Sequence, residues 1–467
     1  MRATSGPKRW PASAACACPC GKTEVAAASG FWCESLLIDG IAVAGVRLEV
    51  DAAGNIARVQ PRTACEAADI RLGTVMPGFG NAHSHAFHRA LRGQTHGEGG
   101  DFWLWRERMF RVAARLDPST YQSLATAVFA EMLVSGYTAV GEFHYLHHRS
   151  DGEPYEPVHA MELALAAAAR TVGIRLVLLD TVYLQGGIGR ELAPEQRAFG
   201  DSSAAGWLAR WQSLRSQLAG EDLVTLGAAL HSVRAVTPDA MREVLDGLPP
   251  EIPLHIHLSE QPQENADCLA AYGLTPAGLL DSLGALAPRL SVVHATHLSD
   301  DDRKLLGDAG VSVVMCPTTE ADLGDGIGPA LALAAAGSSI ALGSDQNAVI
   351  DPFLEMRGLE MGERLASLKR GRFAPAALLG AATVAGYAAL GLGRHRLQPG
   401  DPCDLVEIST TGVRTAGSVP GQLPLTATAA DVLRVIVGGR LVAECGDLAG
   451  GAHPAALMTE ALARLGA

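Results

Sequence analysis

The sequence predicts an α/β protein: a (β/α)8 TIM-like barrel with a small β-sandwich domain built from both chain termini. Two observations support this fold class. Between residues 73 and 345, eight short apolar runs typical of strands alternate with helical patterns, which predicts a parallel sheet covered by helices. Further strand-like runs, divided by turn residues, stand before and after this region. We expect these two outer groups to pair with each other.

The same patterns divide the chain into five parts. We expect barrel strands at 73–82, 137–145, 174–184, 224–233, 253–260, 290–298, 311–317 and 339–345. The predicted parts are a disordered extension (1–30), the first half of the sandwich (31–75), the barrel (76–395), the second half of the sandwich (396–450) and a C-terminal helix (451–467).

Composition and charge exclude several classes of protein. Hydrophobic residues make up 48% of the 467 residues and charged residues 19%, which indicates a globular chain with a large interior. No apolar stretch approaches the ~18 residues of a membrane span. The formal net charge of -13 argues against a nucleic acid or an anionic membrane as a partner. An anionic substrate would therefore need local arginines.

The cysteines and the first residues bear on localisation. Nine cysteines are scattered along the chain, and five of them are predicted to be single thiols of a reducing compartment: Cys65, Cys268, Cys316, Cys403 and Cys445. The cluster of Cys16, Cys18 and Cys20 has no matching second cluster, so we interpret these as incidental thiols. Residues 1–30 lack the apolar core of a signal peptide, and we expect a cytoplasmic protein.

Side chains suited to metal binding stand where the predicted barrel strands end. His83 and His85 follow the first strand at a spacing that directs both side chains to one side. His257, His294 and Asp345 stand at the ends of three later strands. The carboxyl ends of barrel strands meet on one face, where active sites lie. Three of these imidazoles together with the carboxylate suit a catalytic divalent metal with room for a water.

Two further residues fit a hydrolytic reaction at such a metal, which lowers the pKa of bound water toward neutrality. Glu260 follows His257 by three residues and is placed to take the proton of the water and pass it to a leaving group. His294 is expected to polarise the bond under attack or to stabilise the developing charge. Together with Asp345, these residues predict metal-assisted hydrolysis of a C–N bond.

The motifs resemble the deaminase branch of the amidohydrolase superfamily. The resemblance is carried by His83-Ser-His85, His257-Leu-Ser-Glu260, His294 and Asp345. A narrower set of motifs is similar to the formimidoylglutamate deiminase family: His83-Ser-His-Ala-Phe, Phe102-Trp-Leu-Trp-Arg-Glu, Glu142-Phe-His-Tyr-Leu-His-His, His231-Ser-Val-Arg and Cys316-Pro-Thr-Thr-Glu. Members of that family convert N-formimino-L-glutamate and water to N-formyl-L-glutamate and ammonia in histidine degradation.

The resemblance implies a cofactor, site residues and partners. It implies one Zn2+ per chain on His83, His85, His257 and Asp345, although such ligands also accept Fe2+ or Mn2+. It implies Glu260 as proton shuttle, His294 as catalytic histidine, a small dicarboxylate substrate and a homodimer. The residues implied to surround the substrate are His88, Arg106, Tyr145, His231 and Arg234. Arg234 and Tyr145 would hold one carboxylate and Arg106 the other, as arginine forks do.

Four residues depart from the family pattern and leave the exact substrate open. His88 replaces a glutamine, Asp322 replaces an asparagine, and Gln346-Asn347 replaces Ser-His. A neutral histidine donates a hydrogen bond as an amide does, so His88 is compatible with substrate binding. Two alternatives remain: another deaminase of the superfamily, acting on a nucleobase-like or related formimino substrate, and a non-catalytic, metal-containing barrel that serves in binding.

Overall fold

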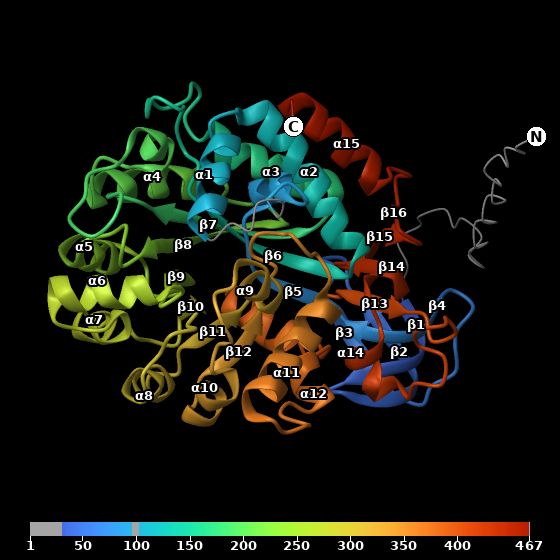
Figure 1. Ribbon diagram of the computed structural model, residues 1–467. Helices are drawn as coiled ribbons and strands as arrows, with labels where there is room; N and C mark the ends of the chain where they lie inside the picture. The colour runs from blue at the N-terminus through green and yellow to red at the C-terminus, as the bar shows by residue number, and fades with distance from the viewer. Residues whose placement is uncertain (1–29, 96–101, 467) are drawn as a thin grey trace, which may run out of the picture.

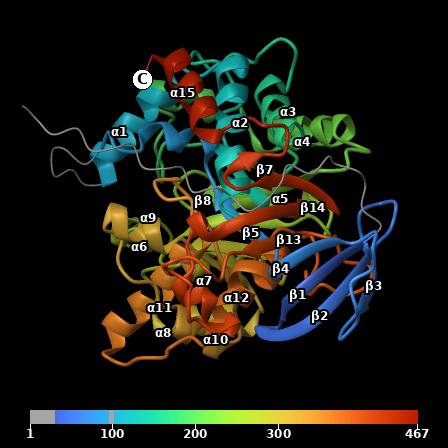
Figure 2. The same cartoon turned by 90° about the vertical axis from the view of Figure 1, so that its right-hand side faces the viewer.

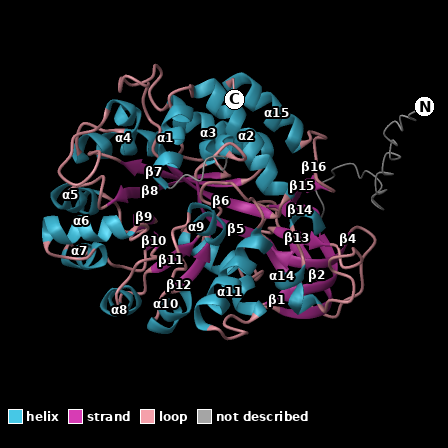
Figure 3. Ribbon diagram, in the orientation of Figure 1, coloured by secondary structure: helices cyan, strands magenta, loops and turns pink. Residues whose placement is uncertain are grey.

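A closed set of eight parallel strands forms the centre of the molecule (Figures 1 and 3). The computed structural model describes residues 30–95 and 102–466. The strands pair in chain order: β5 (Phe79–Ser84), β6 (Tyr137–His144), β7 (Arg175–Val182), β8 (Val224–Ser232), β9 (Leu254–Leu258), β10 (Leu290–His294), β11 (Ser312–Met315) and β12 (Ser339–Leu342). The backbone amides of Ser344 and Asp345 both donate to the His83 carbonyl at 3.0 Å, which joins the last strand to the first. The predicted barrel is confirmed.

Helices surround the barrel strands, which are almost entirely buried, as in parallel sheets covered on the outside. Many begin with a proline in the first turn and several with a capping side chain, as at Asp117, which accepts from the backbone amide of Thr120 at 2.8 Å. The helices are α1 (Phe102–Ala113), α2 (Pro118–Val134), α3 (Ala160–Val172), α4 (Ala204–Gln217), α5 (Pro238–Gly247), α6 (Pro262–Tyr272), α7 (Pro276–Ser282), α8 (Asp300–Asp308), α9 (Pro317–Leu323), α10 (Ala330–Ala336), α11 (Pro352–Ser367), α12 (Pro375–Gly380), α13 (Gly386–Ala389), α14 (Leu423–Thr426) and α15 (Pro454–Leu465).

Shorter helical turns lie between these elements. They are η1 (Ala86–Leu91), η2 (Pro194–Phe199), η3 (Ala381–Ala385), η4 (Pro420–Gln422) and η5 (Ala429–Asp431). η1 directly follows β5 and carries His88. α15 lies against α2 (Figure 1), where Arg464 Nη1 donates to Ser123 Oγ at 3.0 Å.

The second sheet takes strands from both ends of the chain, as predicted (Figure 2). It has the order β16-β15-β14-β13-β4-β1-β2-β3. Its strands are β1 (Gly30–Ile38), β2 (Ile41–Val50), β3 (Ile56–Gln60), β4 (Ile70–Pro77), β13 (Leu405–Ile408), β14 (Val432–Val437), β15 (Arg440–Glu444) and β16 (Asp447–Leu448). Apolar residues from both chain ends share one core, for example Leu36, Leu405 and Ile436.

The expected first barrel strand at 73–82 is in fact two strands. β4 belongs to the second sheet and β5 to the barrel, and Gly78 lies between them. The Gly78 amide donates to the Asp404 carbonyl at 2.9 Å, and a Cβ at this position would overlap the side chain of Thr138. The apolar run is continuous in the sequence, so the pattern did not show that the chain passes from one sheet to the other at Gly78.

A buried ion pair ties the two sheets together. Arg175 on β7 places Nε 2.7 Å from Asp404 Oδ2. The hydroxyl of Tyr387 donates to the same oxygen at 2.7 Å, and the Gly438 amide donates to Oδ1 at 2.7 Å. Asp404 is fully buried, so these partners replace the hydration that its charge loses.

Two other sequence predictions have mixed outcomes. Cys65, Cys268, Cys316 and Cys403 are free thiols, whereas Cys445 is disulfide-bonded, so the prediction of a single thiol was wrong for Cys445. The cluster of Cys16, Cys18 and Cys20 and the predicted extension lie outside the described residues, apart from Gly30, which begins β1. Among the described helices, none is both long and apolar enough to cross a membrane.

Candidate active site

Four side chains predicted as metal ligands converge at the carboxyl end of the barrel. His83 Nε2 lies 3.2 Å from His257 Nε2 and 3.3 Å from Asp345 Oδ1. His85 Nε2 lies 3.4 Å from the same Asp345 oxygen. Ligand atoms bound to one tetrahedral ion at about 2.0–2.2 Å would lie about 3.3–3.6 Å apart. The donor set and its spacing therefore fit a single divalent metal.

Backbone carbonyls orient two of these imidazoles. His85 Nδ1 donates to the Phe143 carbonyl at 2.8 Å, and His257 Nδ1 donates to the His231 carbonyl at 2.9 Å. A proton on Nδ1 leaves the Nε2 lone pair for a metal, which is the usual arrangement of metal-binding histidines. Burial, followed by the neighbouring histidines, lowers the pKa of His257 well below its usual value and the pKa of His85 to about 3. Both rings are therefore neutral near pH 7.

The strand ends that carry the site have strained backbones. Five residues there have a left-handed φ: Ser259 (51°), His294 (70°), Ala295 (50°), Asp345 (41°) and Asn347 (57°). Such conformations cost free energy in non-glycine residues and cluster at functional sites. Gly343 lets β12 approach β5, because a Cβ on it would come within 2.8 Å of the His83 carbonyl oxygen.

Glu260 lies between an arginine and the metal-ligand cluster. Its Oε2 accepts from Arg234 Nη2 at 3.0 Å, and its Oε1 lies 3.9 Å from His294 Nε2. Arg234 Nε also lies 3.0 Å from Glu264 Oε2 on α6. Arg234 thus contacts two carboxylates, which holds the Glu260 side chain in one orientation. Sequence reasoning missed Glu264 because it stands on a helix, away from the strand ends.

His294 is surrounded by carboxylates. Its Nε2 lies 3.9 Å from Asp345 Oδ2, and its Nδ1 lies 3.5 Å from Glu320 Oε1. Burial lowers the pKa of His294, but the carboxylates of Glu320, Glu260 and Asp345 outweigh burial and raise it to about 10. The predicted catalytic histidine therefore faces the point between Glu260 and Asp345. Glu320 on α9 was not singled out from the sequence.

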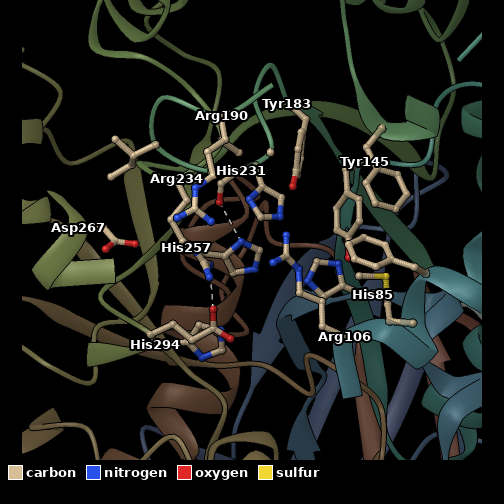
Figure 4. A pocket seen from close by; sticks show the side chains of 18 of the residues that line it. His85, Arg106, Tyr145, Tyr183, Arg190, His231, Arg234, His257, Asp267 and His294 are labelled. Atoms are coloured by element: carbon tan, nitrogen blue, oxygen red, sulfur yellow. Dashed lines mark hydrogen bonds and ion pairs between the residues drawn. The ribbon is translucent and has the colours of Figure 1, made fainter. Parts of the chain in front are cut away.

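A cavity of about 410 Å³ opens onto these groups (Figure 4). It is lined by both predicted catalytic residues that are not metal ligands, Glu260 and His294, and by three predicted ligands, His85, His257 and Asp345. The five predicted substrate residues also line it: His88, Arg106, Tyr145, His231 and Arg234. The structure therefore brings the sequence-predicted residues to one place.

Two predicted substrate residues are bonded to each other. His88 Nε2 lies 2.9 Å from the hydroxyl of Tyr145. Burial, followed by the nearby His85 and His83, lowers the pKa of His88 well below its usual value, so its ring is neutral. The guanidinium of Arg106, on α1, lies 5.2 Å from the ring centre of Phe110, which packs an aromatic face against the cation.

Of the positions that depart from the family pattern, only His88 lines the cavity. Gln346 Nε2 donates to Asp322 Oδ2 at 2.7 Å, so two of the departures satisfy each other. Asn347 donates to the carbonyl of His85 at 3.0 Å and to Ser84 Oγ at 3.1 Å. These residues support the strand ends without facing the cavity.

A second buried group of ionisable residues lies behind the site. His147 Nδ1 lies 2.8 Å from Glu162 Oε1, and His144 Nε2 lies 3.6 Å from the same oxygen. The spacing alone resembles a metal site, but Arg210 Nη1 lies 3.1 Å from Glu162 Oε1 and 2.8 Å from Asp180 Oδ2. A guanidinium already balances these carboxylates, so the group is a salt-bridge network.

The protein is an enzyme of the amidohydrolase family. The model of that family matches residues 74–442, which covers the barrel and strands of the second sheet from both chain ends. The resemblance inferred from the sequence motifs is confirmed at this level. Amidohydrolases generally bind a divalent metal, and two groups of potential ligands that share His83 lie at the barrel mouth: His83, His85 and Asp345, and His83, His257 and His294.

Proteins with similar sequences include a deiminase and two deaminases. The chain is 39% identical over 350 residues to formimidoylglutamate deiminase of Pseudomonas aeruginosa, covering 74% of this chain and 76% of that protein. It is 30% identical over 388 residues to 8-oxoguanine deaminase of the same species, covering 81% and 84%. It is 29% identical over 423 residues to 5-methylthioadenosine/S-adenosylhomocysteine deaminase of Nitratidesulfovibrio vulgaris, covering 86% and 88%.

Two solved structures share the fold over nearly their whole length. An amidohydrolase from Brucella melitensis superposes with a TM-score of 0.86 at 33% identity, covering 94% of this chain and 100% of that one. An adenosine deaminase from Xanthomonas campestris with bound zinc superposes with a TM-score of 0.79 at 26% identity, covering 93% and 97%.

Proposed function

We propose that the protein is a metal-dependent deiminase that hydrolyses N-formimino-L-glutamate to N-formyl-L-glutamate and ammonia. The observation that carries this proposal is the cavity, which is lined both by three of the predicted metal ligands with Glu260 and by arginines. A glutamate-derived substrate brings one C–N group to hydrolyse and two carboxylates to bind. The 39% identical formimidoylglutamate deiminase supports the same substrate.

The chain's own residues divide the chemistry between them. Zn2+ on His83, His85, His257 and Asp345 would lower the pKa of a bound water toward neutrality. Glu260 takes the proton of the attacking water on its Oε1 side, because Arg234 holds Oε2. Glu260 passes this proton to the terminal nitrogen of the formimino group as the oxygen bonds to the carbon. It then carries the second proton, from the hydroxyl of the tetrahedral adduct, to the same nitrogen, which leaves as ammonia as its bond to the carbon breaks. The carbon keeps the oxygen of the water, which gives the formyl product.

His294 and the cavity walls hold the substrate during this exchange. His294 Nε2, 3.9 Å from both Glu260 Oε1 and Asp345 Oδ2, faces the reacting carbon and stabilises the charge that develops there. Arg234 keeps its Nη1 for one substrate carboxylate, since its other two nitrogens face Glu260 and Glu264. The hydroxyl of Tyr145 donates to the same carboxylate.

Arg106 and His231 complete the proposed substrate contacts. Arg106 binds the other carboxylate from α1, and His231 lines the same cavity. A neutral purine or pyrimidine would need amide-type partners in these places, so the arginines disfavour the nucleobase alternative, which the relatives acting on purine derivatives otherwise support.

Ammonia release by metal-loaded protein tests the proposal. The substrates are N-formimino-L-glutamate, 8-oxoguanine, S-adenosylhomocysteine and cytosine, with the metal content of each preparation measured by mass spectrometry. We expect turnover of the formimino substrate with about one metal per chain, and rates at least 100-fold lower with the ring substrates. Turnover of a ring substrate alone would contradict the proposal. The homodimer stays a prediction, which analytical ultracentrifugation would check.

A further inference from the structure

Arg190 is a second cation at the cavity wall that sequence reasoning did not identify. It stands in the loop between β7 and η2, in a tight turn closed by its own backbone. The Gly186 amide donates to the Arg190 carbonyl at 2.9 Å, and the Arg190 amide donates to the Gly187 carbonyl at 2.9 Å. Gly189 permits this turn with a φ of 68°. The turn fixes where the Arg190 side chain leaves the backbone.

Arg190 lines the same cavity as the predicted substrate residues, and Figure 4 labels it among them. Its side chain is exposed and, within residues 30–95 and 102–466, no carboxylate lies within 4.0 Å of it. Asp267 on α6, an acidic residue of the same cavity lining, accepts from Gln263 Nε2 at 2.7 Å. Arg190 thus presents an unbalanced positive charge to the cavity.

Arg234, another arginine of the cavity wall, differs from Arg190 because it already has carboxylate partners. Arg234 contacts Glu260 and Glu264, each at 3.0 Å, so its charge is already offset by two carboxylates. Arg234 therefore offers a substrate carboxylate one hydrogen-bond donor, Nη1, but little net positive charge. Because no carboxylate of the described residues lies within 4.0 Å of Arg190, its guanidinium is a stronger site for a substrate carboxylate than that of Arg234.

We propose that Arg190 is a specificity-determining residue that binds one of the two substrate carboxylates at the cavity wall and so selects dicarboxylates over monocarboxylates. This inference deepens the proposed function and rests on it. Arg190 joins Arg234 and Tyr145 at one carboxylate, and the other carboxylate stays with Arg106. Because Arg190 acts on binding rather than on the reacting carbon, its loss raises KM and leaves kcat nearly unchanged.

Kinetics on a matched set of variants and substrates tests this role. The variants are Arg190→Ala, Arg190→Lys and the control Arg242→Ala, an exposed arginine on α5 that pairs with Asp239 and does not line the cavity. The substrates are N-formimino-L-glutamate, N-formimino-L-norvaline, which lacks the side-chain carboxylate, and N-formimino-4-aminobutyrate, which lacks the α-carboxylate.

With N-formimino-L-glutamate, we expect Arg190→Ala to raise KM about 10- to 100-fold, as for loss of a charged hydrogen bond. The penalty should fall below threefold with one of the two analogues, which identifies the carboxylate that Arg190 binds. Arg190→Lys should recover part of the loss, and Arg242→Ala should match the wild type. An unchanged KM in Arg190→Ala, or an equal penalty with both analogues, would overturn the inference.

A binding measurement separates this inference from the proposed function. Titration calorimetry with glutarate reports dicarboxylate binding without turnover, using the metal-loaded wild type and Arg190→Ala. A glutarate affinity at least tenfold lower in the variant supports the role of Arg190, even if N-formimino-L-glutamate is not turned over. Absence of turnover would rule out only the proposed substrate. Equal affinities, or no binding by the wild type, would overturn the role of Arg190.

Discussion

Replacing Glu260 with glutamine removes a proton acceptor while keeping the shape of the side chain. The amide oxygen still accepts from Arg234, which now lies 3.0 Å from Glu260 Oε2, so the orientation of the group should persist. Arg234 also retains Glu264 at 3.0 Å, and we expect a loss of only about 1 kcal/mol in the free energy of unfolding. Catalysis should suffer far more than stability.

The expected loss follows from the role of the group. General acid–base catalysis contributes about 10²- to 10⁴-fold to a rate, so kcat of Glu260→Gln should fall by that factor. Bound metal should stay at the wild-type level, because Glu260 is not among the four converging ligands. Ammonia release and metal content are measured on the same preparations.

Glu264→Gln is the matched control for this experiment. Glu264 contacts the same arginine and accepts from the Ser259 amide at 2.9 Å, but it does not line the cavity. If both variants lose activity equally, the effect acts through the position of Arg234 and not through proton transfer. A kcat of Glu260→Gln within threefold of the wild type would refute the assignment.

Three further predictions concern the metal, the substrate wall and the junction between the sheets. His257→Ala should lower bound metal at least tenfold and abolish ammonia release, and metal-loaded wild type should melt at a higher temperature than chelator-treated protein, as calorimetry would detect. Tyr145→Phe should raise KM for the formimino substrate about 5- to 50-fold, because the substrate loses a donor and His88 Nε2 loses its partner. Asp404→Asn should cost about 3–5 kcal/mol in urea denaturation, since it leaves the Arg175 charge without its partner. Burial raises the pKa of Asp404, but Arg175 outweighs burial and holds it below 3.8, so the carboxylate contributes stability above that pH and loses it as the pH falls through the lower folded-state pKa. The free energy of unfolding of the variant should therefore decrease less than that of the wild type as the pH falls into the acid range.

Much of the barrel and its mouth followed from the sequence, because both depend on local patterns. Alternating strands and helices fix the barrel, and ligands such as His83, His85 and Asp345 stand next to the strands that position them. Strand ends converge by geometry, so residues far apart in the chain were placed together without knowledge of packing.

The residues that sequence reasoning missed come from other elements. Glu264 and Glu320 stand on helices that turn back over the mouth, and Arg190 stands in a loop. Glu320 ends the Cys316-Pro-Thr-Thr-Glu motif, but the motif alone does not show that its side chain reaches His294. Nothing in the local sequence of Glu264 or Arg190 marks them as contacts of the site.

The strand order of the second sheet has a consequence for synthesis on the ribosome. Leu405 of β13 pairs with Pro77 of β4, although 328 residues separate them in the chain. At ~5–20 residues per second, translation leaves this side of β4 without its neighbour for roughly 20–60 s. An open strand edge invites pairing with other nascent chains. The barrel, whose last strand is translated well before β13, therefore has time to close first, and truncation before Leu405 would leave the edge open permanently.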